Sequence, residues 1–153
     1  MRIHQTMHDS IVDGPGLRYV VFTQGCPHGC PGCHNPDTHD PAGGKEVPVE
    51  ELIQDMLRNP LTDGLTLTGG EPFTQAEDCA KLARAAHEAG LNVWCYSGWT
   101  LEELRDMPEA QVLLQEIDVL VDGPYIEAAR SLSLKWRGSK NQRVIELHEE
   151  SRP

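Results

Sequence analysis

Residues 17–33 read LRYVVFTQGCPHGCPGC, and this stretch decides the fold. Its first half, Leu17 to Gln24, is rich in Tyr, Val, Phe and Thr, which predicts a buried strand. Its second half opens a loop that continues to about Glu46 and is dense in Pro, Gly, His and Asp. So long a loop in a small domain is usually functional or disordered, and its cysteines favour a functional loop. We therefore expect a strand that delivers a ligand-bearing loop to one edge of a sheet.

The rest of the chain alternates between strand-like and helix-like segments. Repeated β–α units indicate a mainly parallel sheet with helical crossovers, and about five units are too few for a closed eight-fold barrel. We expect an α/β fold, an open partial (β/α) barrel of mainly parallel strands, in a single domain spanning residues 1–153. The further strands are predicted at Gly64–Thr68, Asn92–Tyr96, Val119–Val121 and Gln142–Leu147. The helices are predicted at Pro48–Arg58, from a capping box of Thr74 with Glu77 to Gly90, and from a second capping box of Thr100 with Glu103.

Composition narrows the class of protein. The chain has 153 residues, of which 39% are hydrophobic, and a formal net charge of −11. This acidic balance argues against a general nucleic-acid binder, which needs a basic footprint. No run of about 18 apolar residues and no signal-peptide pattern occur, so we expect no membrane span and a cytoplasmic location. Thiols stay reduced there, and clustered cysteines are more often metal ligands than disulfides.

Three cysteines, Cys26, Cys30 and Cys33, are separated by spacers of three and two residues. A [4Fe–4S] cube usually takes four thiolates, so three close thiolates without an obvious fourth indicate a cluster with one open iron. An open iron is a place for chemistry, which points to an enzyme rather than an electron carrier. The alternative is a structural zinc site completed by a nearby histidine. The candidate histidines are His28, His34 and His39.

Unusual residues follow the other predicted strands too, and the carboxyl ends of parallel strands are where such sheets bind ligands. Gly69-Gly70-Glu71-Pro72 follows the second strand, Ser97-Gly98 the third, and Asp122 the fourth. Glycines let backbone carbonyls approach a ligand closely, and carbonyls with a carboxylate suit a cationic ammonium group. We therefore expect these segments to meet the cysteine loop at one edge of the sheet.

Three features outside these loops have competing interpretations. Cys79 falls in a predicted helix and Cys95 in a predicted strand, and we interpret both as core residues. Arg18 follows a turn, where it serves turn chemistry or supports the cofactor or a partner chain. Five cations near the C-terminus form a solvated stretch or an anion-binding, docking segment around Trp136. They are Arg130, Lys135, Arg137, Lys140 and Arg143.

Several of these stretches together resemble a known family. Gly14-Pro15-Gly16-Leu17-Arg18, then Phe22, Gly25, the three cysteines and Asn35, resemble the radical S-adenosylmethionine (SAM) glycyl-radical activating enzymes. The short length resembles the branch that activates anaerobic ribonucleotide reductase. So do residues 94–98, 119–125 and 134–142, and so does Gly32, which replaces an aromatic residue common before the third cysteine.

The resemblance implies cofactors, partners and residue roles. Cys26, Cys30 and Cys33 would hold three irons of a [4Fe–4S] cluster, and SAM would chelate the fourth. Cleavage of SAM would give a 5′-deoxyadenosyl radical that takes hydrogen from a glycine of the large catalytic subunit of anaerobic ribonucleotide reductase. A flavodoxin-type protein would supply the electron. The roles implied for other residues are the methionyl end of SAM for Gly69, Gly70 and Glu71, the cofactor cleft for Ser97, Gly98 and Asp122, and the shape of the cluster loop for His28 and Asn35.

Three alternatives stay open at this point. One is activation of another glycyl-radical enzyme such as pyruvate formate-lyase. The other two belong to different classes, an iron–sulfur electron carrier and a structural zinc-binding module. SAM cleavage separates the enzymes from the carrier, and a visible chromophore separates an iron–sulfur protein from a zinc protein.

Overall fold

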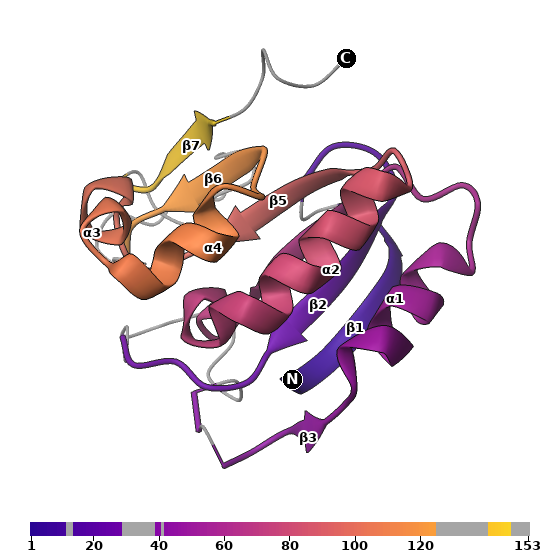
Figure 1. Cartoon of the computed structure of the whole chain (residues 1–153), viewed down its shortest axis with the longest axis horizontal. Coiled ribbons are helices and arrows are strands. Elements are labelled where there is room, and N and C mark those ends of the chain that lie inside the picture. The colour runs from indigo at the N-terminus through magenta and orange to yellow at the C-terminus, as the bar shows by residue number, and fades with distance from the viewer. Residues whose placement is uncertain (12–13, 29–38, 41, 125–140, 148–153) are drawn as a thin grey trace.

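The computed structural model describes residues 1–11, 14–28, 39–40, 42–124 and 141–147, and these residues form a mixed α/β structure built on a seven-stranded sheet (Figure 1). The strand order is β3-β1-β2-β4-β5-β6-β7. The four central strands run parallel and follow one another in chain order, whereas β1, β3 and β7 pair antiparallel at the two sides. The strands are β1 (Arg2–Ser10), β2 (Arg18–Thr23), β3 (Lys45–Glu46), β4 (Gly64–Gly69), β5 (Asn92–Tyr96), β6 (Val119–Asp122) and β7 (Arg143–Glu146).

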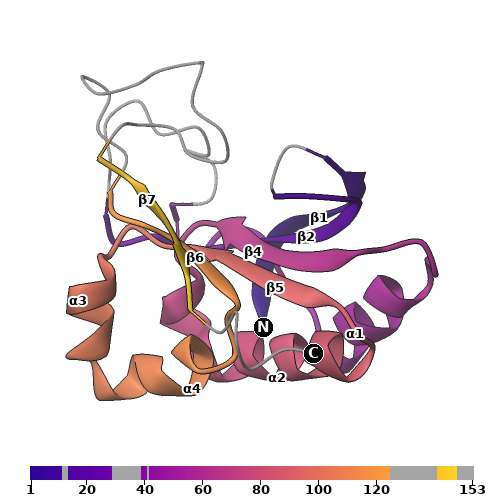
Figure 2. The same cartoon turned by 90° about the horizontal axis from the view of Figure 1, so that it is seen from above.

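The helices cover one face of this sheet, as Figure 2 shows from above. Each parallel strand pair is joined through helical segments, as the right-handed β–α–β arrangement requires. The α-helices are α1 (Val49–Leu57), α2 (Ala76–Glu88), α3 (Leu101–Arg105) and α4 (Gln111–Leu114), and two 3₁₀ turns, η2 (Pro72–Gln75) and η3 (Pro108–Ala110), precede α2 and α4. None of the helices in these described segments is long and apolar enough to cross a membrane.

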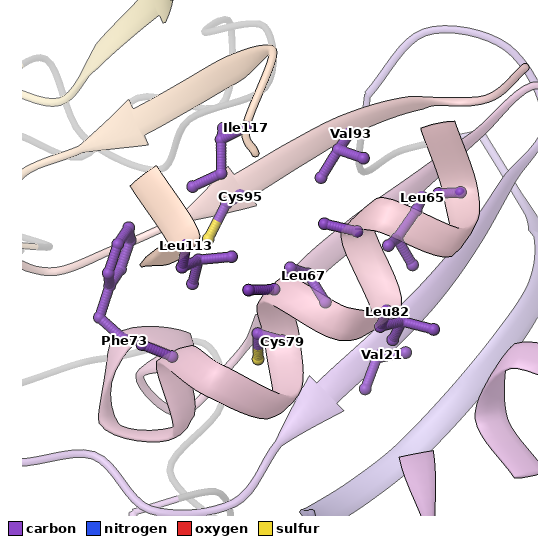
Figure 3. Packing of buried hydrophobic residues seen from close by; sticks show 14 of the residues in the cluster. Val21, Leu65, Leu67, Phe73, Cys79, Leu82, Val93, Cys95, Leu113 and Ile117 are labelled. Atoms are coloured by element: carbon purple, nitrogen blue, oxygen red, sulfur yellow. The ribbon is translucent and has the colours of Figure 1, made fainter. Parts of the chain in front are cut away.

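The core fills the space between the sheet and these helices (Figure 3). Leu65 and Leu67 alternate along β4, so both point to the helix side, where α2 brings Leu82 and Cys79 against them. All four side chains are fully buried. At roughly 25 cal/mol per Å² of apolar surface removed from water, this layer is the main source of stability for the strands that carry the site.

Most of the predicted elements are confirmed. The strands at 18–23, 64–69, 92–96 and 119–122, the helix at 49–57 and the capping box of Thr100 with Glu103 all lie where the sequence places them. The last predicted strand is β7, which pairs antiparallel with β6. The mixed α/β sheet is established by these pairings. Closure of its strands into an open partial barrel stays a prediction.

Two features differ from the sequence-based prediction. The strands β1 and β3 were not predicted. The capping box of Thr74 with Glu77 is wrong, because α2 begins later, at Ala76, after the 3₁₀ turn η2. Thr74 instead donates its hydroxyl to the carbonyl of Glu71 at 2.7 Å. Glu71 caps η2 by accepting the Phe73 amide, so the turn already has its cap.

Candidate functional site

The turn after β4 is joined directly to the loop that follows β2. The amide of Gly70 donates to the carbonyl of Thr23 at 2.9 Å, and the amide of Glu71 donates to the carbonyl of Gly25 at 2.8 Å. These bonds continue the parallel register of β2 and β4, which pairs Thr23 with Gly69. The cysteine loop and the Gly69–Glu71 turn therefore start side by side at the carboxyl edge of the sheet, where the parallel strands end.

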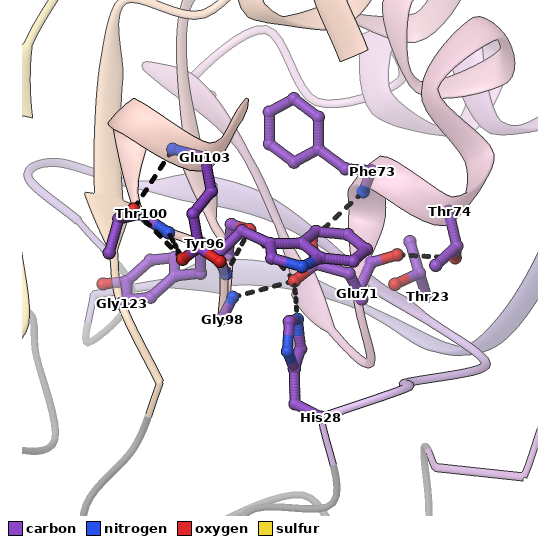
Figure 4. A network of polar contacts seen from close by, with 12 residues as sticks. Thr23, His28, Glu71, Phe73, Thr74, Tyr96, Gly98, Thr100, Glu103 and Gly123 are labelled. Carbon is purple, nitrogen blue, oxygen red and sulfur yellow. Dashed lines mark hydrogen bonds and ion pairs between the residues drawn. The ribbon is translucent and has the colours of Figure 1, made fainter. Parts of the chain in front are cut away.

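The carboxylate of Glu71 lies at the centre of this edge (Figure 4). Its Oε1 accepts from Nε2 of His28 at 2.6 Å, from Oγ of Ser97 at 2.9 Å and from the amide of Gly98 at 2.8 Å. Its Oε2 accepts from the amide of Phe73 at 3.2 Å. The side chain is fully buried, and a buried carboxylate without such donors would be strongly destabilising. Glu71 thus holds together the segments after β2, β4 and β5.

Two glycines in this arrangement leave no room for a side chain. Gly69 has φ +97°, and a Cβ there would lie 2.6 Å from the amide nitrogen of Thr23 and 2.7 Å from Cα of Phe22. A Cβ on Gly98 would lie 2.4 Å from the imidazole of His28. Glycine at both positions lets the turn pack against β2 and lets the histidine reach Glu71.

The loop after β5 is also fixed to β6. The amide of Ser97 donates to the carbonyl of Val121 at 2.9 Å, and the amide of Gly123 donates to the carbonyl of Trp99 at 3.1 Å. The hydroxyl of Ser97 accepts from the amide of Trp99 at 3.1 Å. The predicted convergence of loops is therefore confirmed for the segments after β2, β4, β5 and β6 at the level of their backbones.

Asp122 has a different set of contacts from the one expected of a cleft-lining residue. Its buried carboxylate accepts from the amide of Leu101 at 2.8 Å, which holds the start of α3. It also accepts two hydrogen bonds from the guanidinium of Arg143 on β7, the one from Nε at 3.0 Å. Hydrogen bonds to Asp122 and Glu102 raise the pKa of Arg143. Asp122 therefore secures the sheet beside the site, and its role in the cofactor cleft stays a prediction.

Cys26 is the predicted iron ligand that the described residues include. The residue is half-buried, and its amide donates to the carbonyl of His39 at 3.1 Å. Cys30 and Cys33, with His34 and Asn35, lie outside the described residues. Within the described part of the chain, no three His, Cys, Asp or Glu side chains are grouped as a metal site.

The donor set nevertheless fits an iron–sulfur cluster with an open position. Cys26 is placed next to the Gly69–Glu71 turn, and the two remaining cysteines follow within seven residues of it in the sequence. The Nε2 atom of His39 is buried, and no group in the described part of the chain makes a hydrogen bond with it. Three soft thiolates within one short stretch of sequence are the donors that such a cluster takes.

The other cysteines are core residues, as predicted. Cys79 on α2 and Cys95 on β5 are fully buried in the hydrophobic cluster. Burial raises the pKa of both thiols. The carboxylate of Glu71 adds to this rise in pKa at both cysteines, and the carboxylate of Asp78 adds to it at Cys79. A thiol that resists ionisation is a poor metal ligand and a poor nucleophile.

Arg18 has a structural role at the amino edge of the sheet, where the parallel strands begin. It is fully buried, and it donates to the hydroxyl of Thr66 at 2.7 Å and to the carbonyls of Pro15 and Leu65 at 2.9 and 2.8 Å. Its guanidinium also lies over the ring of Trp94. These contacts favour the turn-chemistry interpretation. Among the five C-terminal cations, Arg143 is paired with Asp122 and Glu102, and the other four lie outside the described residues.

Comparison with known proteins gives consistent results. A family model described as a 4Fe-4S single cluster domain matches residues 12–145. The chain is 37% identical to the anaerobic ribonucleoside-triphosphate reductase-activating protein of Escherichia coli strain K12, over 96% of this chain and 99% of that protein. It is 38% identical to the protein of the same name from Vibrio cholerae serotype O1, over 93% of this chain and 96% of that protein.

Two further matches are more distant or shorter. The pyruvate formate-lyase-activating enzyme of Clostridium pasteurianum is 45% identical, but over 60% of this chain and 40% of that enzyme. Among solved structures, the crystal structure of QueE from Escherichia coli matches with a TM-score of 0.54 at 17% identity, over 79% of this chain and 69% of that chain. The likeness to QueE is a likeness of fold.

Proposed function

The chain belongs to the family of anaerobic ribonucleoside-triphosphate reductase-activating proteins, and we propose that it generates the glycyl radical of an anaerobic ribonucleotide reductase as a radical SAM enzyme. The observation that carries this proposal is the placement of the Cys26 loop directly against the Gly69–Glu71 turn. Backbone hydrogen bonds of 2.8 and 2.9 Å join the two segments. Cys26, the proposed cluster ligand, and the glycine-rich turn thereby lie at the same edge, where a parallel sheet binds its ligands.

Cys26, Cys30 and Cys33 would hold the [4Fe–4S] cluster. When bound, the cluster supplies the electron that cleaves SAM to methionine and a 5′-deoxyadenosyl radical, which takes hydrogen from the Cα of a glycine in the partner. The chain's own contribution is to place the thiolates and to restrict access to this edge. The network of the buried Glu71 and Ser97 with the half-buried Gly98 forms the wall behind it.

The backbone of Gly69 and Gly70 would receive the methionyl end of SAM. Both lack a side chain, so their carbonyls can approach an ammonium group closely. Ser97 and Gly98 would line the neighbouring wall of the cofactor cleft, with Asp122 behind them. Glu71 belongs to the same turn, and its carboxylate is held by four donors from the protein.

The partner would be the large catalytic subunit of the reductase. The helices lie on one face of the sheet (Figure 2), so we place the approach of the partner's glycine segment on the other face. The chain would form a single radical SAM domain with the shape of an open partial barrel. A dry site closed by that segment would contain a radical that otherwise attacks its nearest neighbour. A flavodoxin-type protein in the cytoplasm would supply the electron.

Anaerobic reconstitution tests this function. The purified chain would be loaded with iron and sulfide, reduced and mixed with SAM, and 5′-deoxyadenosine would be measured. The reductase subunit and pyruvate formate-lyase would then be offered separately, and glycyl-radical formation would be followed by electron paramagnetic resonance. A radical on the reductase subunit is expected. A cluster-loaded protein that yields no 5′-deoxyadenosine, or a radical on pyruvate formate-lyase alone, would overturn the proposal.

A further inference from the structure

The carboxylate of Glu71 is occupied by the protein itself. Three donors meet on Oε1 and one on Oε2, and the side chain has no exposed surface. Each oxygen of an ionised carboxylate offers about two acceptor sites, so three donors saturate Oε1, whereas Oε2 accepts one donor and lies in the buried interior. At Oε1 an ammonium group of a ligand would have to displace one of these donors, and the remaining acceptor site on Oε2 has no exposed surface through which a ligand could reach it.

From this geometry we propose that Glu71 is a positioning residue that acts through His28, holding the Cys26 loop against the Gly69–Gly70 turn, rather than a ligand of SAM. The inference rests on the proposed function for the identity of the bound cofactor. The hydrogen bond between His28 and Glu71, called the brace below, belongs to the protein itself and exists before any cofactor binds.

The position of His28 is defined on several sides. Its side chain is 13% exposed, and its Nε2 lies 2.6 Å from Oε1 of Glu71. The imidazole packs edge-on against the ring of Trp99, with centroids 4.7 Å apart. Gly98 provides the space, because a Cβ there would collide with the imidazole. Contacts with the Trp99 ring, the Gly98 backbone and the Glu71 carboxylate therefore hold the His28 imidazole in one orientation.

The brace encloses the first cluster ligand between two attachments. On one side of Cys26, the carbonyl of Gly25 accepts the amide of Glu71 at 2.8 Å. On the other side, His28 donates to the carboxylate of the same glutamate. The short stretch that carries the Cys26 thiol is therefore fixed at both ends to one residue of the turn. Loss of either attachment would let the thiolate and the turn move relative to each other.

Three variants separate a positioning role from direct binding. His28→Phe keeps the ring against Trp99 and removes the donor. Glu71→Gln keeps the size of the side chain and replaces one acceptor oxygen by a donor. The double variant completes a double-mutant cycle with the wild type and the two single variants. If the two residues act as one unit, the effects of the single substitutions will not add up in the double variant. In the apoprotein, we expect amide exchange at Gly98 and Cys26 to be roughly tenfold faster or more in each variant, the effect of losing a hydrogen bond to a charged group.

SAM affinity of the reconstituted protein gives the second measurement. A positioning role predicts that His28→Phe and Glu71→Gln weaken SAM binding by similar factors, of roughly tenfold, and that the double variant is no weaker than either. His28→Gln, which restores an N–H donor, should recover part of the affinity and of the exchange protection.

A matched control lies at the opposite edge of the sheet. His87 donates from Nε2 to Oδ2 of Asp118 at 2.9 Å, and its side chain is 10% exposed. His87→Phe therefore removes a similar histidine–carboxylate bond far from the cysteine loop. We expect it to leave exchange at Gly98 and SAM affinity unchanged.

The outcomes are decisive in both directions. If Glu71→Gln weakens SAM binding by tenfold or more while His28→Phe does not, Glu71 contacts SAM directly and the proposal is wrong. Unchanged exchange at Gly98 and Cys26 in both folded variants would also overturn it. Failure of the proposed function is a separate result, because it appears in the wild-type protein as absent SAM cleavage, while amide exchange in the apoprotein reports the brace alone.

Discussion

The two edges of the sheet use the same chemical pair for different ends. At the carboxyl edge, Glu71 accepts from His28 at 2.6 Å, and at the amino edge, Asp118 accepts from His87 at 2.9 Å. Each carboxylate also accepts a backbone amide. Asp118 accepts that of Val93, at the start of β5.

The difference lies in what each pair connects. His87 and Asp118 tie the end of α2 to the start of β6, two elements already held by the core and by ladder hydrogen bonds. Glu71 and His28 tie together segments that lie outside helices and strands, including the start of the cysteine loop. Side-chain bonds therefore set the geometry of the carboxyl edge, whereas at the amino edge they reinforce a geometry that the backbone already sets. Substitutions should consequently affect cofactor binding at one edge and only stability at the other.

The largest contrast is expected among the five cysteines. Cys26→Ala, Cys30→Ala and Cys33→Ala should each abolish the cluster and SAM cleavage, because two thiolates do not hold the cube securely. Cys79→Ala and Cys95→Ala should keep both, at a cost of about 1 kcal/mol in unfolding free energy from a small cavity. Iron content and 5′-deoxyadenosine yield of the five variants measure this. A Cys79→Ala protein that loses its cluster while Cys26→Ala retains one would reverse the assignment.

The next contrast concerns two glycines with positive φ, one at each edge. Gly69→Ala should cost about 3 kcal/mol or more, since left-handed strain of about 1–2 kcal/mol adds to overpacking against backbone atoms 2.6–2.7 Å away. Gly90 has φ +80° and open space, so Gly90→Ala should cost about 1 kcal/mol. Urea denaturation of the apoproteins measures both.

Cofactor binding sharpens the same comparison. Gly69→Ala, where it folds, should also weaken SAM binding, because the turn can no longer pack against Thr23. Gly90→Ala should bind SAM as the wild type does. Equal stability losses at the two glycines would mean that the turn after β4 has more freedom than its packing indicates.

Much of this difference between the edges could be predicted from the sequence. The order of strands and helices and the convergence of Gly69, Gly98 and the cysteine loop follow from local patterns, since strand ends in a parallel sheet share an edge. The pairing of His28 with Glu71 spans 43 positions, and no local pattern reports it. The resemblance to the family instead implies separate roles, loop shape for His28 and SAM binding for Glu71.

Two errors of sequence interpretation have physical causes. The strand β1 buries Ile3 and Ser10 but exposes most residues between them, so it shows little hydrophobic alternation, and its pairing with β2 is what makes it a strand. The Thr74–Glu77 pattern is that of a capping box. Glu71 caps the preceding 3₁₀ turn first and shifts the start of α2.

A smaller effect is expected at Arg143, beside the carboxyl edge. Arg143→Ala would leave the buried carboxylate of Asp122 with the Leu101 amide and without its cation, at a cost of about 1–3 kcal/mol in unfolding free energy. Arg143→Lys should recover only part, because a lysine cannot make the two-pronged contact. As a control, Glu102→Ala removes the exposed partner of the same arginine and should cost less than about 1 kcal/mol. Equal losses in Arg143→Ala and Glu102→Ala would show that burial of Asp122 is not the cause.

The smallest effect is expected from Arg84, at the amino edge. Its Nε lies 3.4 Å from Oε1 of Glu116, and its side chain is 48% exposed. An exposed ion pair gains little because water screens it and ordering two side chains costs entropy, so Arg84→Ala should change the unfolding free energy by no more than about 0.5 kcal/mol. Urea denaturation at low and high salt measures it, with Arg143→Ala as the comparison. Glu116 also lies 3.5 Å from Nδ1 of His87, so a loss above about 1 kcal/mol would show that Arg84 acts through this histidine. The amino edge would then depend on a side-chain network as the carboxyl edge does, and the two edges would differ only in that the carboxyl edge lies beside the proposed cofactor site.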